Sequence, residues 1–341
     1  MAALSILEGK KMQKKLLDLL VVLPQAKVMG SLDKVITDVT FDSRKVQEGS
    51  LFICLKGAHV DGHKYIEQAY KDGAACVLVE DEIKNRPEGL TVIKVNDTRD
   101  AMGYVAPWFF DYPGKKMRMI GVTGTNGKTT TTNIIRLILR KAGFKVGLIG
   151  TINIMIEDEI EVSHNTTPDV VDLERSLYKM QQAGCDYVVM EVSSHALALN
   201  RVAGCEYDVA VLTNITQDHL DFHETFENYR KAKALLFESL HTGNKTDKCA
   251  IFNMDDQSSE IIIKSTKSPI MTYGKAETND VYPLFWKIEA KHMQLDLQTP
   301  AGELHLLLHI TGEFNVYNVM AAVSAMIAEK INLKVIEDTL N

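Results

Sequence analysis

The segment MIGVTGTNGKTTTT, at residues 119–132, combines the residue types that bind nucleotide phosphates. Glycines at 124 and 127 would let backbone amides converge on an anion, and Lys128 would add a full positive charge. Thr129 would offer a hydroxyl to the magnesium that accompanies a nucleotide. The usual pattern is G-x-x-x-x-G-K-[ST], but Val122 stands where its first glycine is expected. The alternative is a tight turn with a solvated Lys128; the position between a buried strand and a helix favours a phosphate site.

Glu191 ends the apolar run YVVME and is followed by two serines. A carboxylate at a strand end is often only exposed to solvent. Beside a phosphate loop, however, it suits the metal side of a nucleotide site, so we interpret Glu191 as functional.

The segment 214–240 places Asp218, His219, Asp221 and His223 in a loop that leads into a helix. Two histidines and two aspartates could indicate zinc, but no cysteine or His-x-x-x-His pair accompanies them. An oxygen-rich magnesium site agrees better with a nucleotide loop.

Two further features stay open on residue type alone. Lys233 lies in KAKALLF on the following helix, where its spacing favours an amphipathic side chain on the helix surface. The segment SHNTTPD at 163–169 reads as a loop that leads to a helix N-cap.

The elements that would position these residues fall into two predicted domains. Residues 1–112 read as a small mixed α/β domain, with a helix in the segment TRDAMGYVAPWFFDYPG that Pro107 bends or ends. Turn-rich DYPGKK at 111–116 marks the boundary. From 113 to 341 strands and helices alternate, which predicts a doubly wound, mostly parallel α/β sheet that binds ligands at the carboxyl ends of its strands. Residues 281–311 alternate apolar and polar, which predicts a small antiparallel hairpin.

Composition narrows the classes of function. A chain of 341 residues with 45% hydrophobic and 24% charged residues is typical of a globular protein. Its net charge of −7 argues against nucleic acid as a partner. No apolar run reaches the ~20 residues of a membrane span, and the N-terminus lacks the pattern of a secretory signal, so we expect a cytoplasmic protein without membrane insertion. Five scattered cysteines are expected to be buried thiols.

Together these motifs resemble the Mur ligase family, the ATP-dependent amide-forming ligases of peptidoglycan precursor synthesis. The family loop is G-T-N-G-K-[TS], which accounts for the displaced glycine. The further matching segments are MEVSSHAL (190–197), TNITQDHLDFH (213–223), YRKAKALLF (229–237), NMDD (253–256), GEFNVYN (312–318), TFDSR (40–44) and KGAHVDGHKYI (56–66).

The resemblance implies a set of site residues. The ATP phosphates would be held by Gly124, Thr125, Asn126, Gly127, Lys128, Thr129 and Thr130. One Mg²⁺ would bind Thr129 and Glu191, and a second His219 and Lys233, with Lys233 carbamylated by CO₂. Lys128, Glu191, His219 and Lys233 would be catalytic. The UDP part of the substrate would meet Phe41, Ser43, Ala58, His59 and Val60, and the muramoyl-dipeptide would meet Asn165, Thr166, Thr167, Ser193 and Arg201. Leu199 departs from the family, where a polar residue is common, so one substrate contact is expected to be missing.

The implied reaction adds the third peptide residue, a diamino acid, to UDP-MurNAc-L-Ala-D-Glu. The substrate carboxylate would attack the γ-phosphate of ATP to give an acyl phosphate, which the incoming amine would then displace. The diamino acid, meso-diaminopimelate or L-lysine, stays open. Nothing in the chain matches the family's C-terminal, amino-acid-binding domain, so we expect a truncated, monomeric and inactive form. The alternatives are a folylpolyglutamate-type ligase and a non-catalytic nucleotide-binding relative.

Overall fold

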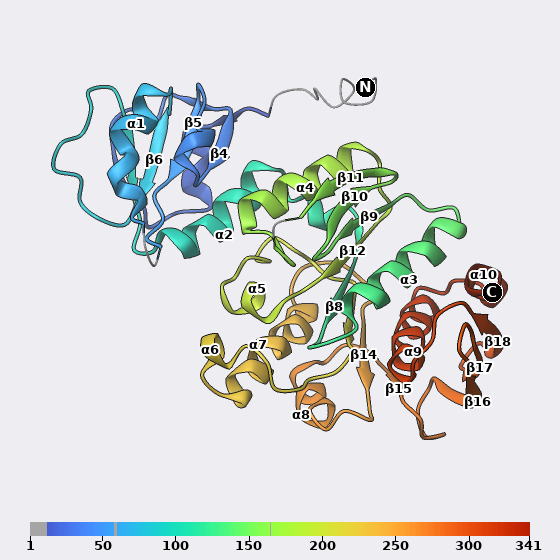
Figure 1. The fold of residues 1–341 in the computed structure, drawn as a ribbon. Coiled ribbons are helices and arrows are strands. Elements are labelled where there is room, and N and C mark those ends of the chain that lie inside the picture. Colours follow the sequence, from blue (N-terminus) through green and yellow to red (C-terminus); the bar gives the residue numbers. More distant parts are fainter. Residues whose placement is uncertain (1–11, 58–59, 164) are drawn as a thin grey trace. The chain divides into compact units, whose positions relative to one another are not determined.

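The computed structural model describes residues 12–57, 60–163 and 165–341 (Figure 1). The chain forms two compact units that interleave along the sequence. Unit 1 contains residues 1–113, 169–179 and 200–204, and unit 2 contains residues 114–168, 180–199 and 205–341. Two short segments that follow the phosphate loop in sequence therefore belong to the same unit as the N-terminal residues.

Unit 1 is built on a five-stranded sheet in the order β2-β7-β6-β5-β4. The pairs β4–β5, β5–β6 and β6–β7 are parallel, and β2 joins β7 antiparallel. Strand β6 (Cys76–Val79) is buried on both faces because its side chains alternate between two apolar clusters. Cys76 and Leu78 pack in one cluster with α2 (Thr98–Phe109), while Val77 and Val79 pack in the other.

Helix α2 continues through Pro107 and ends two residues later, at Phe109. Asp97 caps its start by accepting the amide hydrogens of Arg99 and Asp100 at 2.8 and 2.9 Å. The proline therefore lies in the last turn, and the helix continues for only two residues beyond it.

One buried carboxyl group in unit 1 is unusual. Glu174, on α4 (Val170–Gln182), is 0% exposed, and neither of its oxygens has a hydrogen-bond partner within the described residues. Burial raises the pKa of Glu174 to about 8, because a charged carboxylate is poorly solvated there.

Unit 2 is organised by an eight-stranded sheet in the order β11-β10-β9-β12-β8-β13-β14-β15. Strands β9, β12, β8, β13, β14 and β15 are parallel, and β10 and β11 are antiparallel additions. The predicted mostly parallel, doubly wound α/β sheet is thus confirmed. Figure 1 shows α3 (Lys128–Lys141) and α9 (Glu313–Ala328) on one side of this sheet and α7 (Phe226–Glu238) on the other.

The chain order explains where a ligand site can form. Strand β8 (Arg118–Thr123) lies between β12 (Tyr187–Glu191) and β13 (Val209–Leu212). The chain runs from β8 to β9 on the β12 side of the sheet and later crosses from β12 to β13 on the other side of β8, so the strand order reverses here. This is a topological switch point, and the loops after the three strands meet at its carboxyl edge. The glycine loop follows β8, Glu191 ends β12, and the segment 213–223 follows β13.

A small sheet completes unit 2. Residues 281–311 form three antiparallel strands, β16-β17-β18, rather than a single hairpin, because a turn near Glu289 divides the first predicted arm. The inner face of this sheet shares one core with α9 and α3. Helix α9 is buried along most of its length, which fits the largely apolar run that follows Asn318.

The remaining elements are short. Strands are β1 (Lys14–Lys15), β2 (Lys27–Met29), β3 (Val35–Ile36), β4 (Asp38–Thr40), β5 (Ser50–Ile53), β7 (Thr91–Lys94), β9 (Val146–Ile149), β10 (Asn153–Ile156), β11 (Glu159–Val162), β14 (Cys249–Asn253), β15 (Ile270–Tyr273), β16 (Tyr282–Ile288), β17 (Met293–Thr299) and β18 (Gly302–Leu308). Helices are α1 (Ile66–Lys71), α5 (Ser194–Ala198), α6 (Leu220–His223), α8 (Ser259–Ile262) and α10 (Leu333–Leu340), with 3₁₀ turns η1 (Leu16–Val21), η2 (Ser43–Lys45), η3 (Gly62–Tyr65), η4 (Pro113–Lys115), η5 (Ser239–His241) and η6 (Ile263–Ser265).

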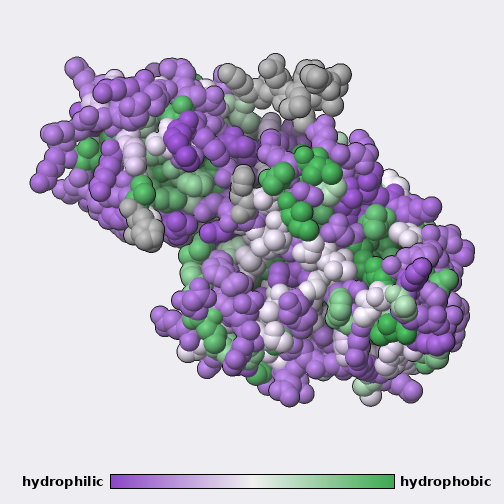
Figure 2. All heavy atoms as spheres, in the orientation of Figure 1, coloured by the Kyte–Doolittle hydropathy of each residue, from purple (hydrophilic) through white to green (hydrophobic). Residues whose placement is uncertain are grey.

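The face drawn in Figure 2 is largely hydrophilic, with scattered hydrophobic patches. Across the described residues, no helix combines the length and the apolar character needed to cross a bilayer. The five cysteines are unbridged, and four of them are buried.

Candidate functional site

The glycine loop at residues 124–129 is bridged by hydrogen bonds from its own lysine. Lys128 Nζ donates to the carbonyl oxygens of Gly124 and Thr125 at 2.7 and 2.8 Å. Burial lowers the pKa of Lys128, while the negative charges of Glu191 and Asp218 act in the opposite direction. Lys128 is therefore bonded to the loop and not merely solvated, while phosphate binding by this loop stays a prediction.

Both glycines of the loop are required by their surroundings. Gly124 has φ +150°, and a Cβ there would lie 1.9 Å from Thr213 Oγ1. Gly127 has φ +87°, and a Cβ there would lie 2.2 Å from Asn318 Oδ1. These are left-handed conformations in which any side chain would also collide with its neighbours. The displaced glycine thus lies where the chain passes Thr213, at the end of β13.

Glu191 is held by two hydroxyls and an amide. Its oxygens each accept from Thr129 Oγ1 at 3.0 Å, and they accept from Thr151 Oγ1 and the Thr151 amide at 3.0 and 2.9 Å. Glu191 is 1% exposed, so these hydrogen bonds replace the water that its carboxylate loses. The predicted metal-side pair, Thr129 and Glu191, is thus in direct contact.

Lys233 lies inside the protein, not on the helix surface. Its side chain is 1% exposed, and Nζ donates to the Gly124 carbonyl at 2.8 Å. Nζ also lies 4.5 Å from the ring centroid of Tyr229, one turn earlier on α7. Burial, and secondarily the charge of Lys128, hold the pKa of Lys233 well below its ordinary value. The surface alternative that spacing favoured is wrong, because α7 turns this face toward the phosphate loop.

His219 begins a short helix in a left-handed backbone conformation, with φ +52°. Its ring lies 4.8 Å from that of His195 and 6.2 Å from that of Tyr229, measured between centroids. His219 Nε2 is 3.5 Å from a carboxylate oxygen of Asp218. By contrast, His223 is buried and its Nε2 is 3.0 Å from Ser194 Oγ. Of the predicted group, Asp218, His219 and Asp221 are exposed to solvent, whereas His223 is buried and contacts Ser194 inside the protein.

The donor set fits a hard divalent cation at one position. Thr129 and Glu191 place hydroxyl and carboxylate oxygens together at the phosphate loop, which is the ligand chemistry of Mg²⁺. Lys233 as an amine is not such a ligand. Its depressed pKa favours the neutral amine, which is the form able to react with CO₂.

The segment after β11 supplies further polar groups in unit 2. Thr167 Oγ1 donates to the Glu191 carbonyl at 2.9 Å and accepts from the Ser193 amide at 3.1 Å. Thr166 Oγ1 lies 3.1 Å from Thr151 Oγ1, and Asn165 is exposed. The structure therefore places Thr166, Thr167 and Ser193 around the strand end that carries Glu191.

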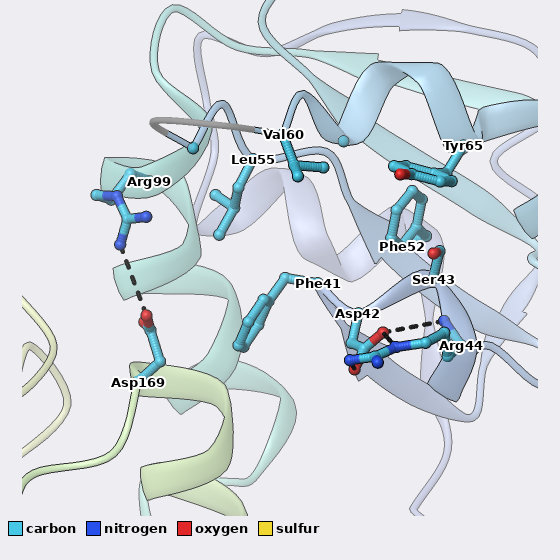
Figure 3. Close-up of a pocket in the computed structure, with 12 residues that line it drawn as sticks. Phe41, Asp42, Ser43, Arg44, Phe52, Leu55, Val60, Tyr65, Arg99 and Asp169 are labelled. Carbon is cyan, nitrogen blue, oxygen red and sulfur yellow. Dashed lines mark hydrogen bonds and ion pairs between the residues drawn. The ribbon is translucent and has the colours of Figure 1, made fainter. Parts of the chain in front are cut away.

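Unit 1 contains a separate pocket of about 570 Å³ (Figure 3). Of the residues predicted to meet a UDP group, Phe41, Ser43 and Val60 line it, while Ala58 and His59 lie outside the described residues. The other lining residues are Asp42, Arg44, Phe52, Leu55, Gly57, Gly62, Tyr65, Arg99 and Asp169. This pocket is partly aromatic and open, and it carries charged residues on its wall.

Arg201 also belongs to unit 1. Its Nε is 3.7 Å from Asp169 Oδ2, so the predicted substrate-binding guanidinium faces a carboxylate that lines the pocket. Leu199, the departure from the family pattern, is the C-cap of α5.

Sequence reasoning missed three residues that the structure brings to the unit 2 site. Thr151 follows a predicted strand at its carboxyl end, so the rule used for Glu191 could have found it. Tyr229 stands four residues before Lys233 on a helix, and this spacing signals a shared face. His195 carried no signal, because its contact with His219 joins α5 to the start of α6, which are separate segments of the chain.

Comparison with known proteins gives matches along most of the chain. Residues 122–326 match the Mur ligase middle domain, and residues 35–107 match the Mur ligase family, catalytic domain. A UDP-N-acetylmuramoyl-L-alanyl-D-glutamate–2,6-diaminopimelate ligase from Geobacillus kaustophilus is 45% identical over 330 residues, which is 96% of this chain and 66% of the relative. The enzyme of the same name from Bacillus licheniformis is 44% identical over 304 residues, 89% of this chain and 62% of the relative.

Solved structures agree with these matches. The structure of a UDP-N-acetylmuramoyl-L-alanyl-D-glutamate–2,6-diaminopimelate ligase superimposes with a TM-score of 0.80 at 28% identity, covering 94% of this chain and 66% of that one. MurF from Acinetobacter baumannii shares the fold, with a TM-score of 0.71 at 23% identity, over 96% of this chain and 68% of that one. The chain spans about 62–66% of the length of these curated relatives.

Proposed function

The chain belongs to the Mur ligase family, and from this premise we propose that it is the substrate- and ATP-binding part of an amide ligase. The proposed reaction joins a diamino acid to UDP-MurNAc-L-Ala-D-Glu through an acyl phosphate. The names of the relatives favour 2,6-diaminopimelate over L-lysine. In this proposal unit 1 binds the uridine nucleotide and unit 2 binds ATP.

The convergence of three groups on one loop carries the proposal. Lys128 and Lys233 both donate to the Gly124 carbonyl, and Thr129 of the same loop contacts Glu191. A simple phosphate-binding turn needs neither a buried second lysine nor a buried carboxylate, both of which cost free energy to desolvate. Phosphoryl transfer to a carboxylate needs both cationic charge and metal ligands at the γ-phosphate.

The residues divide the chemistry as follows. The loop amides and Lys128 would hold the phosphates and stabilise the charge that develops when the substrate carboxylate attacks the γ-phosphate. Thr129 and Glu191 would hold one Mg²⁺, and His219 with carbamylated Lys233 a second; bound Mg²⁺ supplies Lewis-acid stabilisation of phosphoryl oxygens. Carbamylation joins the neutral Lys233 amine to the carbon of CO₂ and releases one proton. It converts a buried amine into an oxygen ligand.

Substrate binding is proposed to use both units. Phe41, Ser43 and Val60, together with Ala58 and His59, would meet the uridine nucleotide. Asn165, Thr166, Thr167, Ser193 and Arg201 would contact the muramoyl-dipeptide. Once the acyl phosphate has formed, the amine of the diamino acid attacks the acyl carbon, and phosphate leaves from the tetrahedral intermediate.

The test separates binding from ligation, because the chain spans only part of its relatives' length. Calorimetry with UDP-MurNAc-L-Ala-D-Glu and with ADP and Mg²⁺ should show one site for each on this chain. Ligation is followed by product mass, with 2,6-diaminopimelate or L-lysine. It is measured for this chain and for an extended protein, in which the part of the Geobacillus kaustophilus relative beyond the match is joined to it. Absence of binding by the dipeptide nucleotide would reject the substrate assignment.

A folylpolyglutamate-type ligase is the second candidate. The apo form of L. casei FPGS shares the fold with a TM-score of 0.54 at 20% identity, but over only 70% of this chain. The unit 1 pocket favours the nucleotide substrate. Calorimetric binding of a folate in place of the UDP substrate would reverse this order.

A further inference from the structure

Asp169 is placed between two guanidinium groups in unit 1. Its Oδ2 atom lies 3.6 Å from a terminal nitrogen of Arg99 and 3.7 Å from Nε of Arg201. Its Oδ1 atom accepts the amide hydrogen of Val170 at 2.9 Å, at the start of α4. One oxygen therefore fixes the carboxylate on the helix, and the other faces both arginines.

Both guanidiniums lie near the same carboxylate oxygen and are partly open to solvent. The side chain of Arg99 is 36% exposed and that of Arg201 is 21% exposed. A contact of 3.6 Å is longer than a hydrogen bond, so Asp169 balances charge without occupying the close-range donor positions of Arg99. Arg99 therefore keeps a planar fork of N–H groups that suits phosphate oxygens.

The second arginine of the pocket differs. Arg44 donates from Nε and Nη2 to the two oxygens of Asp42 at 2.9 and 2.8 Å. This is a two-point ion pair, and the Arg44 side chain is 87% exposed. Arg44 is thus already paired with its neighbour, whereas Arg99 is oriented by a carboxylate at longer range.

The pocket joins an apolar part to this charged part. Figure 3 shows Arg99 and Asp169 at one end, Ser43 and Tyr65 at the other, and Leu55 and Val60 between them. A ligand that fits has a flat, partly apolar portion and an anionic portion several bonds away. A nucleoside diphosphate has this construction.

We propose that Arg99 binds the diphosphate of the uridine nucleotide. In this proposal Asp169 is a positioning residue that fixes the orientation of the Arg99 and Arg201 guanidiniums. This inference rests on the proposed function, because it takes the uridine nucleotide as the occupant of the pocket. It goes beyond that function by assigning the phosphate contact to a residue on α2.

The test compares uridine, UMP and UDP binding by calorimetry on the whole chain. Arg99→Ala should weaken UDP binding by about 10- to 100-fold, the usual value of a hydrogen bond to a charged group, and uridine binding by less than about twofold. Arg99→Lys keeps the charge but loses the fork, so its loss should be intermediate. Lys94→Ala, which removes a cation paired with Glu82 away from the pocket lining, is the matched control.

Asp169→Asn separates positioning from simple attraction. The substitution makes the pocket more positive, so simple attraction predicts tighter UDP binding, whereas positioning predicts weaker binding. Asparagine keeps an oxygen for the Val170 amide, so the start of α4 should be preserved. Asp169→Glu should recover part of the UDP affinity.

The outcomes distinguish the two levels of inference. If the unaltered chain binds neither uridine nor UDP, both the proposed nucleotide substrate and the proposed roles of Arg99 and Asp169 are rejected. If UDP binds but Arg99→Ala weakens uridine and UDP equally, or Asp169→Asn binds UDP more tightly, only the roles of Arg99 and Asp169 are rejected.

Discussion

The charged side chains of the two candidate sites differ in burial and in the distance to their partners. In unit 2, Glu191 and Lys233 are each 1% exposed and are held by hydrogen bonds of 2.8–3.0 Å. In unit 1, Asp169 faces Arg99 and Arg201 at 3.6 and 3.7 Å in a partly exposed pocket. Buried charges need close partners because their desolvation is costly, whereas exposed ones retain water. Substitutions should therefore have large effects in unit 2 and graded effects in unit 1.

The largest effect is expected at Lys233. Lys233→Ala should reduce ligation by the extended protein at least about 100-fold, since it removes a proposed metal ligand. Short carboxylates should restore part of the rate, whereas Lys231→Ala, at an exposed position paired with Glu227, should not change it. Rates are measured as phosphate release. Undiminished turnover by Lys233→Ala would contradict the carbamate assignment.

The same residue should show the opposite effect on stability. Because the folded pKa of Lys233 is depressed, the unfolded chain binds more protons below pH 10.5 and stability rises as pH increases toward that value. Lys233→Met removes this dependence and should raise the free energy of unfolding near neutral pH by about 1 kcal/mol. Urea unfolding at several pH values measures it. A destabilised Lys233→Met protein would show that the hydrogen bond to Gly124 outweighs the desolvation of Nζ.

Glu191→Gln should weaken binding of ADP in the presence of Mg²⁺ at least about tenfold. The amide keeps the size of the carboxylate and one oxygen for Thr129 and Thr151, but it loses the charge that attracts a cation. Calorimetry with and without Mg²⁺ isolates this effect. Equal Mg²⁺ dependence in both proteins would remove Glu191 from the metal site, and UDP binding in unit 1 serves as the control.

Glu174 tests whether unit 1 tolerates a buried charge. Its folded pKa, about 8, exceeds its ordinary value of 4.5, so the folded state binds more protons in this window. The contribution to stability is therefore fully present below pH 4.5 and is lost as pH rises through 8, by up to about 1.4 kcal/mol per pH unit. Glu174→Gln should flatten this slope in urea unfolding. A slope unchanged by the substitution would place the titration on another group.

The smallest effect is expected at Ser43, on the wall of the open pocket. Ser43→Ala should weaken UDP binding by about 2- to 10-fold, the value of one neutral hydrogen bond in a solvated site. Calorimetry with UDP measures it. A loss as large as that of Glu191→Gln in unit 2 would break the contrast between the two sites.

The sequence predicted the helices and strands better than it predicted the burial and the contacts of individual side chains. Local patterns sufficed for the parallel strands, the phosphate loop and the carboxyl edge where Glu191 lies, because periodicity and chain order determine them. They failed for Lys233, whose helix spacing suits a surface residue, since burial depends on which face α7 turns to the sheet. They also missed Thr151, Tyr229 and Arg99, whose partners come from other segments. Contacts between distant segments leave no local pattern to read.

The carbonyl of Gly124 accepts hydrogen bonds from both Lys128 and Lys233. In the proposed function, a nucleotide phosphate would take these lysine hydrogen bonds from the carbonyl, so it would exchange existing bonds for new ones. Part of the enthalpy of each new phosphate contact is offset by the bond that it replaces. Calorimetric enthalpies of nucleotide binding should accordingly be smaller than a count of phosphate contacts suggests.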